Sequence, residues 1–199
     1  MTADIRQRCY QAIVRDSGLD PEAVCDRCHV ILFAERRSSF GRYDDSIHLL
    51  TPETEYSFKG NVDPSRTGWN GPVGKYYAQL TPGVWPVRTG PHRGRPNNFR
   101  QLTEKEAKYV GLERFFHDGR ALGKYTVKRV QKDLTGKTEH GYFAINGHSG
   151  AEKSTSSWGC WTFDPDDWAV FQPRAYLELA KHNQTWPDGG TVLVLTEAQ

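Results

Sequence analysis

Short apolar runs separated by glycine and proline set the main limit on how this chain can fold. Five of them are rich in β-branched and aromatic residues and end at polar or turn-forming residues. These runs are residues 29–34, 46–50, 125–130, 142–146 and 191–195. With 19 Gly and 11 Pro among its 199 residues, the chain favours short strands and many turns over a helical bundle. We therefore expect a mainly β domain of the α+β class.

Helical spacing is confined to a few segments. Between residues 3 and 14, apolar residues recur every three or four positions, which predicts an N-terminal helix and makes residues 1–24 a helical lead-in. Residues 166–179 have the pattern of an amphipathic C-terminal helix, interrupted at Pro173, where the backbone lacks an N–H donor. A weaker helical pattern covers residues 104–116. We therefore expect a helix near each end of a β domain.

Residues 59–98 are the longest stretch without a regular pattern. Seven Gly and six Pro fall within it, and a long loop inside a compact domain more often carries function than fills space. We therefore predict a long Gly/Pro-rich loop region that serves as a lid. Within it, residues 83–88 have the character of a strand, which Pro86 would restrict to a sheet edge or a bulge. At 199 residues, the whole chain fits a single domain.

The charge of the chain is nearly balanced, with 26 Lys and Arg against 24 Asp and Glu. A net charge of +2 is too small for nucleic-acid binding through overall charge, so no nucleic-acid partner is expected. The distribution is uneven, because residues 86–133 carry 12 basic and 5 acidic side chains. An anionic polymer bound along this segment and a solvated basic face without a partner are both consistent with that imbalance.

The sequence gives no sign of membrane insertion or export. No stretch approaches the roughly 20 apolar residues that cross a bilayer. The first ten residues include Asp4 and lack the apolar core of a secretory signal, so we expect synthesis in the cytoplasm. The four cysteines are too few and too scattered for a disulfide framework, so reduced thiols are expected.

The densest chemical signal lies in residues 145–162. A predicted strand leads into His148, a loop of small polar residues follows, and Cys160 comes directly after Gly159. A thiol attacks a carbonyl well only as thiolate, and a neighbouring imidazole lowers the thiol pKa by taking its proton. A glycine lets a substrate approach the backbone, whose N–H groups then serve as an oxyanion hole. The alternative is a buried cysteine between two tryptophans and an ordinary, hydrogen-bonded histidine.

These residues also carry a family resemblance. The element His148-Ser-Gly150, followed by Thr155-Ser-Ser-Trp-Gly-Cys160, resembles the catalytic signature of the L,D-transpeptidase catalytic domain family. The resemblance implies that Cys160 is the nucleophile, that His148 is the base, that the backbone carbonyl of Ser149 orients the imidazole, and that Gly159 lies on the oxyanion side. It implies a single catalytic domain with a β-sandwich-like fold and no metal or cofactor, acting on peptidoglycan stem peptides.

The chain departs from the family pattern in two places near the cysteine. Trp158 stands where a second histidine is common, and Thr162 stands where an arginine often holds a substrate carboxylate. The resemblance therefore leaves open whether the enzyme hydrolyses stem peptides or exchanges crosslinks. Eight residues are predicted to contact substrate, from the polar turn, the basic loop and the cysteine segment: Tyr43, Asp44, Arg88, His92, Arg93, Ser157, Trp158 and Thr162.

A second motif, Cys25-Asp-Arg-Cys28-His29, spells the C-x-x-C-H pattern of c-type haem attachment. A zinc site would need two further ligands, of which Cys9 is one candidate. The simpler interpretation is that Cys25 and Cys28 pack the end of a helix against the first strand. We therefore expect no cofactor here.

The function that these observations favour is a peptidoglycan-active cysteine enzyme. The pattern is most similar to versions from tailed bacteriophages and prophages, which implies a lysin or wall-remodelling enzyme that reaches the periplasmic wall after release or delivery. The alternatives are a non-catalytic wall-binding or virion structural protein, and a secreted antibacterial effector of the same fold. The sequence leaves the oligomeric state open.

Overall fold

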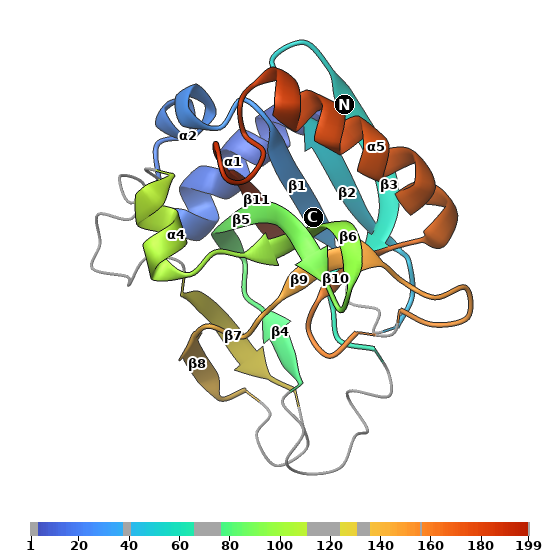
Figure 1. Ribbon diagram of the computed structural model, residues 1–199. Coiled ribbons are helices and arrows are strands. Elements are labelled where there is room, and N and C mark those ends of the chain that lie inside the picture. The colour runs from blue at the N-terminus through green and yellow to red at the C-terminus, as the bar shows by residue number, and fades with distance from the viewer. Residues whose placement is uncertain are drawn as a thin grey trace.

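A computed structural model describes residues 4–37, 41–65, 77–110, 124–130, 136–155 and 157–198. Eight strands close into a barrel, a three-stranded sheet stands beside it, and helices cover the barrel from outside and above (Figure 1). The expectation of a mainly β domain of the α+β class is confirmed. Within the described part of the chain, no helix combines the length and the apolar character needed to cross a bilayer.

The barrel joins strands that lie far apart in the sequence. Its order around the barrel is β1 (Ile31–Arg36), β11 (Thr191–Glu197), β5 (Gly83–His92), β6 (Arg95–Gln101), β9 (Asn146–Ser149), β10 (Trp161–Phe163), β3 (Glu55–Asn61) and β2 (Asp45–Leu50). Most neighbours are antiparallel, but β1 pairs with β11 and β9 pairs with β10 in parallel. The second of these parallel pairs places the two halves of the predicted chemical motif side by side.

Alternation along the strands divides the apolar residues between two cores. Leu32 and Leu193 belong to the interior cluster, whereas their neighbours Phe33 and Val192 belong to the cluster outside the barrel. This is the period of two that a strand imposes on its side chains. The outer cluster is covered by two helices, α1 (Ile5–Ser17) and α2 (Pro21–Arg27), which confirm the helical lead-in.

Helix α5 (Pro165–Lys181) packs against β3, β6 and β9. It begins at Asp164, whose side chain accepts a hydrogen bond from the backbone of Asp166 at 3.0 Å. The expected interruption at Pro173 is wrong, because the helix continues through it. A proline inside a helix costs about 3 kcal/mol. Burial of the apolar side chains on the inner face, at about 1.5–3 kcal/mol for each large one, offsets that cost.

The predicted long loop over residues 59–98 is largely wrong. Strands β4 (Ala78–Leu80), β5 and β6 account for most of its described part, and residues 66–76 lie outside the described residues. Pro86 lies inside β5, between β11 and β6, so it is not at a sheet edge. Its carbonyl accepts a hydrogen bond from the Tyr125 hydroxyl at 2.7 Å. Gly94 serves the tight β5–β6 turn, where its φ is +75°, and Gly90 lies at the register shift in β5.

The small sheet contains β4, β7 (Tyr125–Arg129) and β8 (Thr138–Gly141). The strand predicted over residues 142–146 is wrong, because no strand covers residues 142–145 and β9 begins only at Asn146. Ala144 has φ of +51°, which a strand does not allow. The segment instead links the small sheet to the barrel. Helix α4 (Glu104–Tyr109) confirms the start of the predicted helix at 104–116, and residues 111–116 lie outside the described residues.

Candidate functional site

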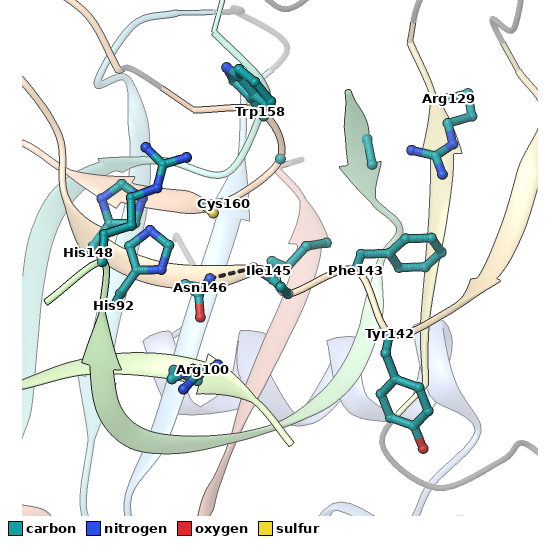
Figure 2. A pocket seen from close by; sticks show the side chains of 14 residues that line it. His92, Arg100, Arg129, Tyr142, Phe143, Ile145, Asn146, His148, Trp158 and Cys160 are labelled. Carbon is teal, nitrogen blue, oxygen red and sulfur yellow. Dashed lines mark hydrogen bonds between the residues drawn. The ribbon is translucent and has the colours of Figure 1, made fainter. Parts of the chain in front are cut away.

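A pocket of about 690 Å³ lies where the small sheet meets the barrel. Its lining comes from β4, β7, the 142–145 link, β9, the segment before β10, and the β5–β6 hairpin. Both Cys160 and His148 line it, and Figure 2 shows their side chains in the same part of the pocket. The structure therefore brings together the thiol and the imidazole that the sequence singles out.

The parallel pairing of β9 and β10 is what joins them. Trp161 lies opposite Gly147 and Thr162 lies opposite His148, so Cys160 enters β10 beside Asn146. A β-carbon on Gly147 would lie 2.2 Å from the Trp161 ring. The indole therefore occupies the face that a side chain at 147 would need. Asn146 and His148, one position to either side of Gly147, share the opposite face of the strand, toward the pocket.

The His148 ring is held in one orientation by the backbone. Its Nδ1 atom lies 2.7 Å from the carbonyl oxygen of Ser149. A carbonyl oxygen only accepts, so Nδ1 carries the hydrogen in this bond and Nε2 keeps its lone pair. Burial lowers the pKa of His148, and the charges of Arg93 and Arg95 lower it further, against the opposing effect of the Ser149 bond. His148 is therefore a neutral base at neutral pH, and Ser149 has the orienting role that the resemblance implies.

The Cys160 thiol has a pKa above the ordinary thiol value. Burial raises this pKa, and the hydrogen bonds from the backbone and side-chain amides of Asn146, with the charge of Arg93, lower it only in part. The expectation of a thiol pKa depressed by the neighbouring imidazole is wrong for the free protein. The physical reason is that the pocket withdraws the sulfur from water without supplying a full countercharge. The resting pair is a neutral thiol and a neutral imidazole.

Asn146 is a site residue that sequence reasoning missed. Only 2% of it is exposed, and its side-chain nitrogen donates to the carbonyl of Ala144 as well as toward the Cys160 sulfur. Its side-chain oxygen is buried and has no hydrogen-bond partner among the residues that the structure describes. The available signal was its position two residues before His148, which places both side chains on one face of a strand.

The turn before the nucleophile is fixed by Ser157 and Gly159. The Ser157 hydroxyl donates to the carbonyl of Cys160 and accepts from the backbone N–H of Gly159 at 3.0 Å. Gly159 has φ of +144°, and a β-carbon there would lie 2.5 Å from the carbonyl oxygen of Ala78. Its N–H is thus engaged inside the turn, so the structure supports a positioning role for Gly159 rather than donation to an oxyanion. Ser157 is buried and holds the turn instead of lining the pocket.

The predicted substrate-contact residues divide into two groups. His92, Arg93 and Trp158 line the pocket. Thr162 does not, because it is fully buried on β10. Arg88 is paired with Glu106 at 2.9 Å and also lies outside the lining.

The polar turn shapes the neighbouring loop instead of the pocket. The Tyr43 hydroxyl lies within hydrogen-bond distance of the carbonyl oxygens of Ala151 and Ser154, at 2.9 and 3.0 Å. A β-carbon on Gly150 would lie 1.8 Å from that hydroxyl oxygen, so the loop closes tightly on the tyrosine. Asp44, next to Tyr43, is not among the residues that line the pocket. The structure thus shows Tyr43 supporting the loop after β9, and its contact with substrate stays a prediction.

The basic loop predicted around Arg88 to Arg95 is the β5–β6 hairpin. His92, near its turn, stacks on His148 with ring centroids 5.0 Å apart and an interplanar angle of 14°. Burial lowers the pKa of His92 to about 4, and the charges of His148 and the nearby arginines add to the effect. A second pocket of about 460 Å³ shares His92, Arg93 and His148 with the first and extends past Ser149. The histidine pair therefore stands between two adjoining hollows.

The C-x-x-C-H motif contributes no residue to this pocket and belongs to the cluster outside the barrel. Cys28 is buried in the outer cluster, and Cys25 packs against that cluster from α2. The rings of His29 and His182 lie 5.3 Å apart. Among the described residues, no three His, Cys, Asp or Glu side chains gather in a way that could hold a metal ion. Packing of the helix end against the sheet accounts for both cysteines.

No protein-family model matches the chain, and a comparison with curated proteins gives no significant match. The function of the site is therefore inferred from its own geometry and chemistry.

Proposed function

We propose that the chain is a peptidoglycan-active cysteine enzyme that cleaves or exchanges amide bonds in stem peptides through a thioester on Cys160. The observation that carries the proposal is the placement of Cys160 and His148 on paired parallel strands in one pocket, with the Nδ1 atom of His148 bonded to the Ser149 carbonyl. That bond leaves Nε2 as the only ring atom able to accept a proton. A thiol, a base and a group that orients the base are the components of nucleophilic acyl transfer.

The resting protonation states determine how the first step proceeds. The thiol and the imidazole both start neutral, so His148 takes the thiol proton on Nε2 as the sulfur bonds to the stem-peptide carbonyl carbon. The C–N bond then breaks, the leaving amine takes the proton from His148, and a thioester remains on Cys160. Water, or a second amine, attacks the thioester and restores the thiol. The Asn146 amide, which already donates toward the sulfur, is a donor at the reacting atom.

Peptidoglycan as the substrate, and an L,D-transpeptidase-like architecture, are parts of the same proposal. Their support is the similarity of the His148-Ser-Gly150 and Thr155–Cys160 elements to the family signature, together with the positions of His148, Ser149 and Cys160 in the pocket. The place of action would be the bacterial wall, as for a phage or prophage lysin or a wall-remodelling enzyme.

Digestion of purified sacculi tests the proposal. The full chain should release soluble fragments with shortened or exchanged stem peptides, identified by mass spectrometry. Cys160→Ala and His148→Ala should each lower the rate at least about 100-fold, whereas Cys25→Ala, a matched change at a thiol on α2, should retain it. Undiminished release by Cys160→Ala would refute the mechanism. Binding to sacculi without any fragments from the unmodified chain would favour a wall-binding protein.

A further inference from the structure

An arginine without a partner among the described residues faces the pocket that holds the candidate nucleophile. Three arginines line the pocket, and none of the described lining residues is an aspartate or glutamate. The charge of Arg129 is matched by Glu139 at 2.5 Å. Arg93 and Arg100 have neither an ion pair nor a side-chain hydrogen bond within the described part of the chain, and Arg100 is the one that the sheet pairs with Asn146. An uncompensated guanidinium in a partly enclosed site is a ready partner for an anionic group.

The sheet register places Arg100 directly beside Asn146. The two residues are opposite each other in the antiparallel pair of β6 and β9, so their side chains leave the same face of the sheet a few ångströms apart. The next residue in this row, across β5, is Arg88, whose charge is neutralised by Glu106 at 2.9 Å. Arg100 is therefore the member of the row whose charge is left for a ligand, and Figure 2 shows it on the side of the pocket toward which the Asn146 oxygen points.

Asn146 supplies an independent observation. Its side-chain nitrogen is engaged by Ala144 and Cys160, which fixes which end of the amide is the oxygen. That oxygen is buried without a partner in the described residues, although a buried acceptor normally has one. An amide oxygen only accepts, so the group that completes it is an N–H or O–H donor. The ligand chemistry is thus a hydrogen-bond donor next to an anion, and in a peptide the donor at hand is an amide N–H.

A carboxyl-terminal amino-acid residue has this combination, because its amide N–H and its free carboxylate are attached to the same α-carbon. We propose that Arg100 and Asn146 form a specificity subsite that binds a free terminal carboxylate and the adjacent N–H of the substrate peptide. This inference rests on the proposed function, since it assigns the substrate of the same pocket. It makes the enzyme selective for peptides that end in the pocket as free acids over those that are amidated or continue further.

A binding experiment tests the subsite without turnover. The Cys160→Ala protein is titrated by calorimetry with a stem-peptide analogue whose only carboxylate is the terminal one, and with the same peptide as its carboxamide. The free acid should bind at least about tenfold more tightly, as expected for a charge-assisted pair. Arg100→Gln in the same background should remove most of this preference. Arg174→Gln, which removes an equal charge on α5 where the guanidinium lies over Tyr56, should leave the preference unchanged.

A kinetic comparison adds a second measurement. With Cys160 intact, Arg100→Gln should raise KM for the free acid and change the kinetics of the carboxamide little. Asn146→Asp, which places a negative charge beside the subsite, should reverse the preference toward the carboxamide. Equal binding of acid and amide, binding of neither, or a preference that survives Arg100→Gln would overturn the inference. Carboxylate-selective binding without any cleavage of sacculi would instead refute the proposed enzyme activity and leave the subsite standing.

Discussion

Replacement of Gly159 by alanine should destabilise the protein and displace the nucleophile that follows it. Gly159 has φ of +144°, a conformation that side-chain-bearing residues rarely adopt. A β-carbon there would lie 2.5 Å from the carbonyl oxygen of Ala78. Because that oxygen belongs to the backbone of β4, no rotation of a side chain relieves the clash. The Ala78 N–H also donates to the carbonyl of Trp158 at 3.0 Å, which holds the two segments together.

The magnitude follows from these two contributions. Forcing alanine into such a conformation costs about 1–3 kcal/mol, and overpacking against fixed atoms costs about 1–3 kcal/mol more. Gly94→Ala is the matched control, because Gly94 also has a positive φ, +75°, but a β-carbon there meets nothing within 4 Å. The control carries only the conformational cost. The difference between the variants, about 1–3 kcal/mol, therefore reports the contact with Ala78 together with any excess strain at φ +144° over φ +75°.

Urea and thermal unfolding of both variants provide the measurement. For a chain of this length, 1 kcal/mol shifts the melting temperature by about 2–4 °C. Gly159→Ala should thus melt about 2–12 °C below Gly94→Ala. It should also lose activity on sacculi, because relief of the clash moves the turn that ends at Cys160. A Gly159→Ala protein that is as stable as Gly94→Ala would show that the turn is not packed tightly against β4. It would also refute the positioning role of Gly159.

Two further predictions concern ionisable groups. Burial would raise the pKa of Glu35, but hydrogen bonds from His48 and Arg8 outweigh this effect and lower that pKa to about 2. The ionised carboxylate therefore contributes about 3 kcal/mol to the free energy of unfolding. This contribution is fully present above the pKa of the unfolded chain and is lost as the pH falls through about 2. The difference in unfolding free energy between the unmodified protein and Glu35→Gln should therefore be large at pH 7 and shrink between pH 5 and pH 2, and a pH-independent difference would contradict this pairing. Alkylation of Cys160 by iodoacetamide, followed by peptide mass spectrometry, should be slow at pH 7 and still rising beyond pH 9, because burial raises the thiol pKa. A rate that levels off near pH 7 would instead indicate a preformed thiolate and imidazolium.

The local elements of this fold could be predicted because their signals are local. The apolar runs at 29–34, 46–50 and 191–195 lie largely in β1, β2 and β11, and their side chains are buried on both faces. Closure of the barrel depends instead on contacts between distant segments, such as Ile31 with Val192, which no short-range pattern contains. The strand prediction for residues 142–145 was wrong for a different reason. The aromatic side chains of this segment are typical of a strand, but here they line a pocket.

The residues of the site also divide into those that a local sequence pattern reveals and those that only distant strand pairing brings in. The motif that contains His148 and Cys160 lies within one short stretch of sequence, so the proximity of the two side chains could be predicted. Arg100 reaches the site only through the pairing of β6 with β9, and its distance along the chain from Asn146 hid the connection. Thr162 was predicted to contact substrate because it stands where the family signature often has a carboxylate-binding arginine. The strand that begins directly after Cys160 buries it instead.

The charges around His148 connect binding to catalysis. Burial, with the charges of Arg93 and Arg95, holds the imidazole pKa below its ordinary value, which keeps the ring neutral but makes it a weak base. Arg93 also favours the thiolate form of Cys160, so the same charge assists the nucleophile and opposes its base. A substrate carboxylate bound at Arg100 would bring negative charge into a pocket whose described lining has none. That charge would raise the His148 pKa toward neutrality, where a base transfers protons most effectively. The neutral resting pair would then become an effective proton-transfer pair only when a peptide with a free carboxylate is in place.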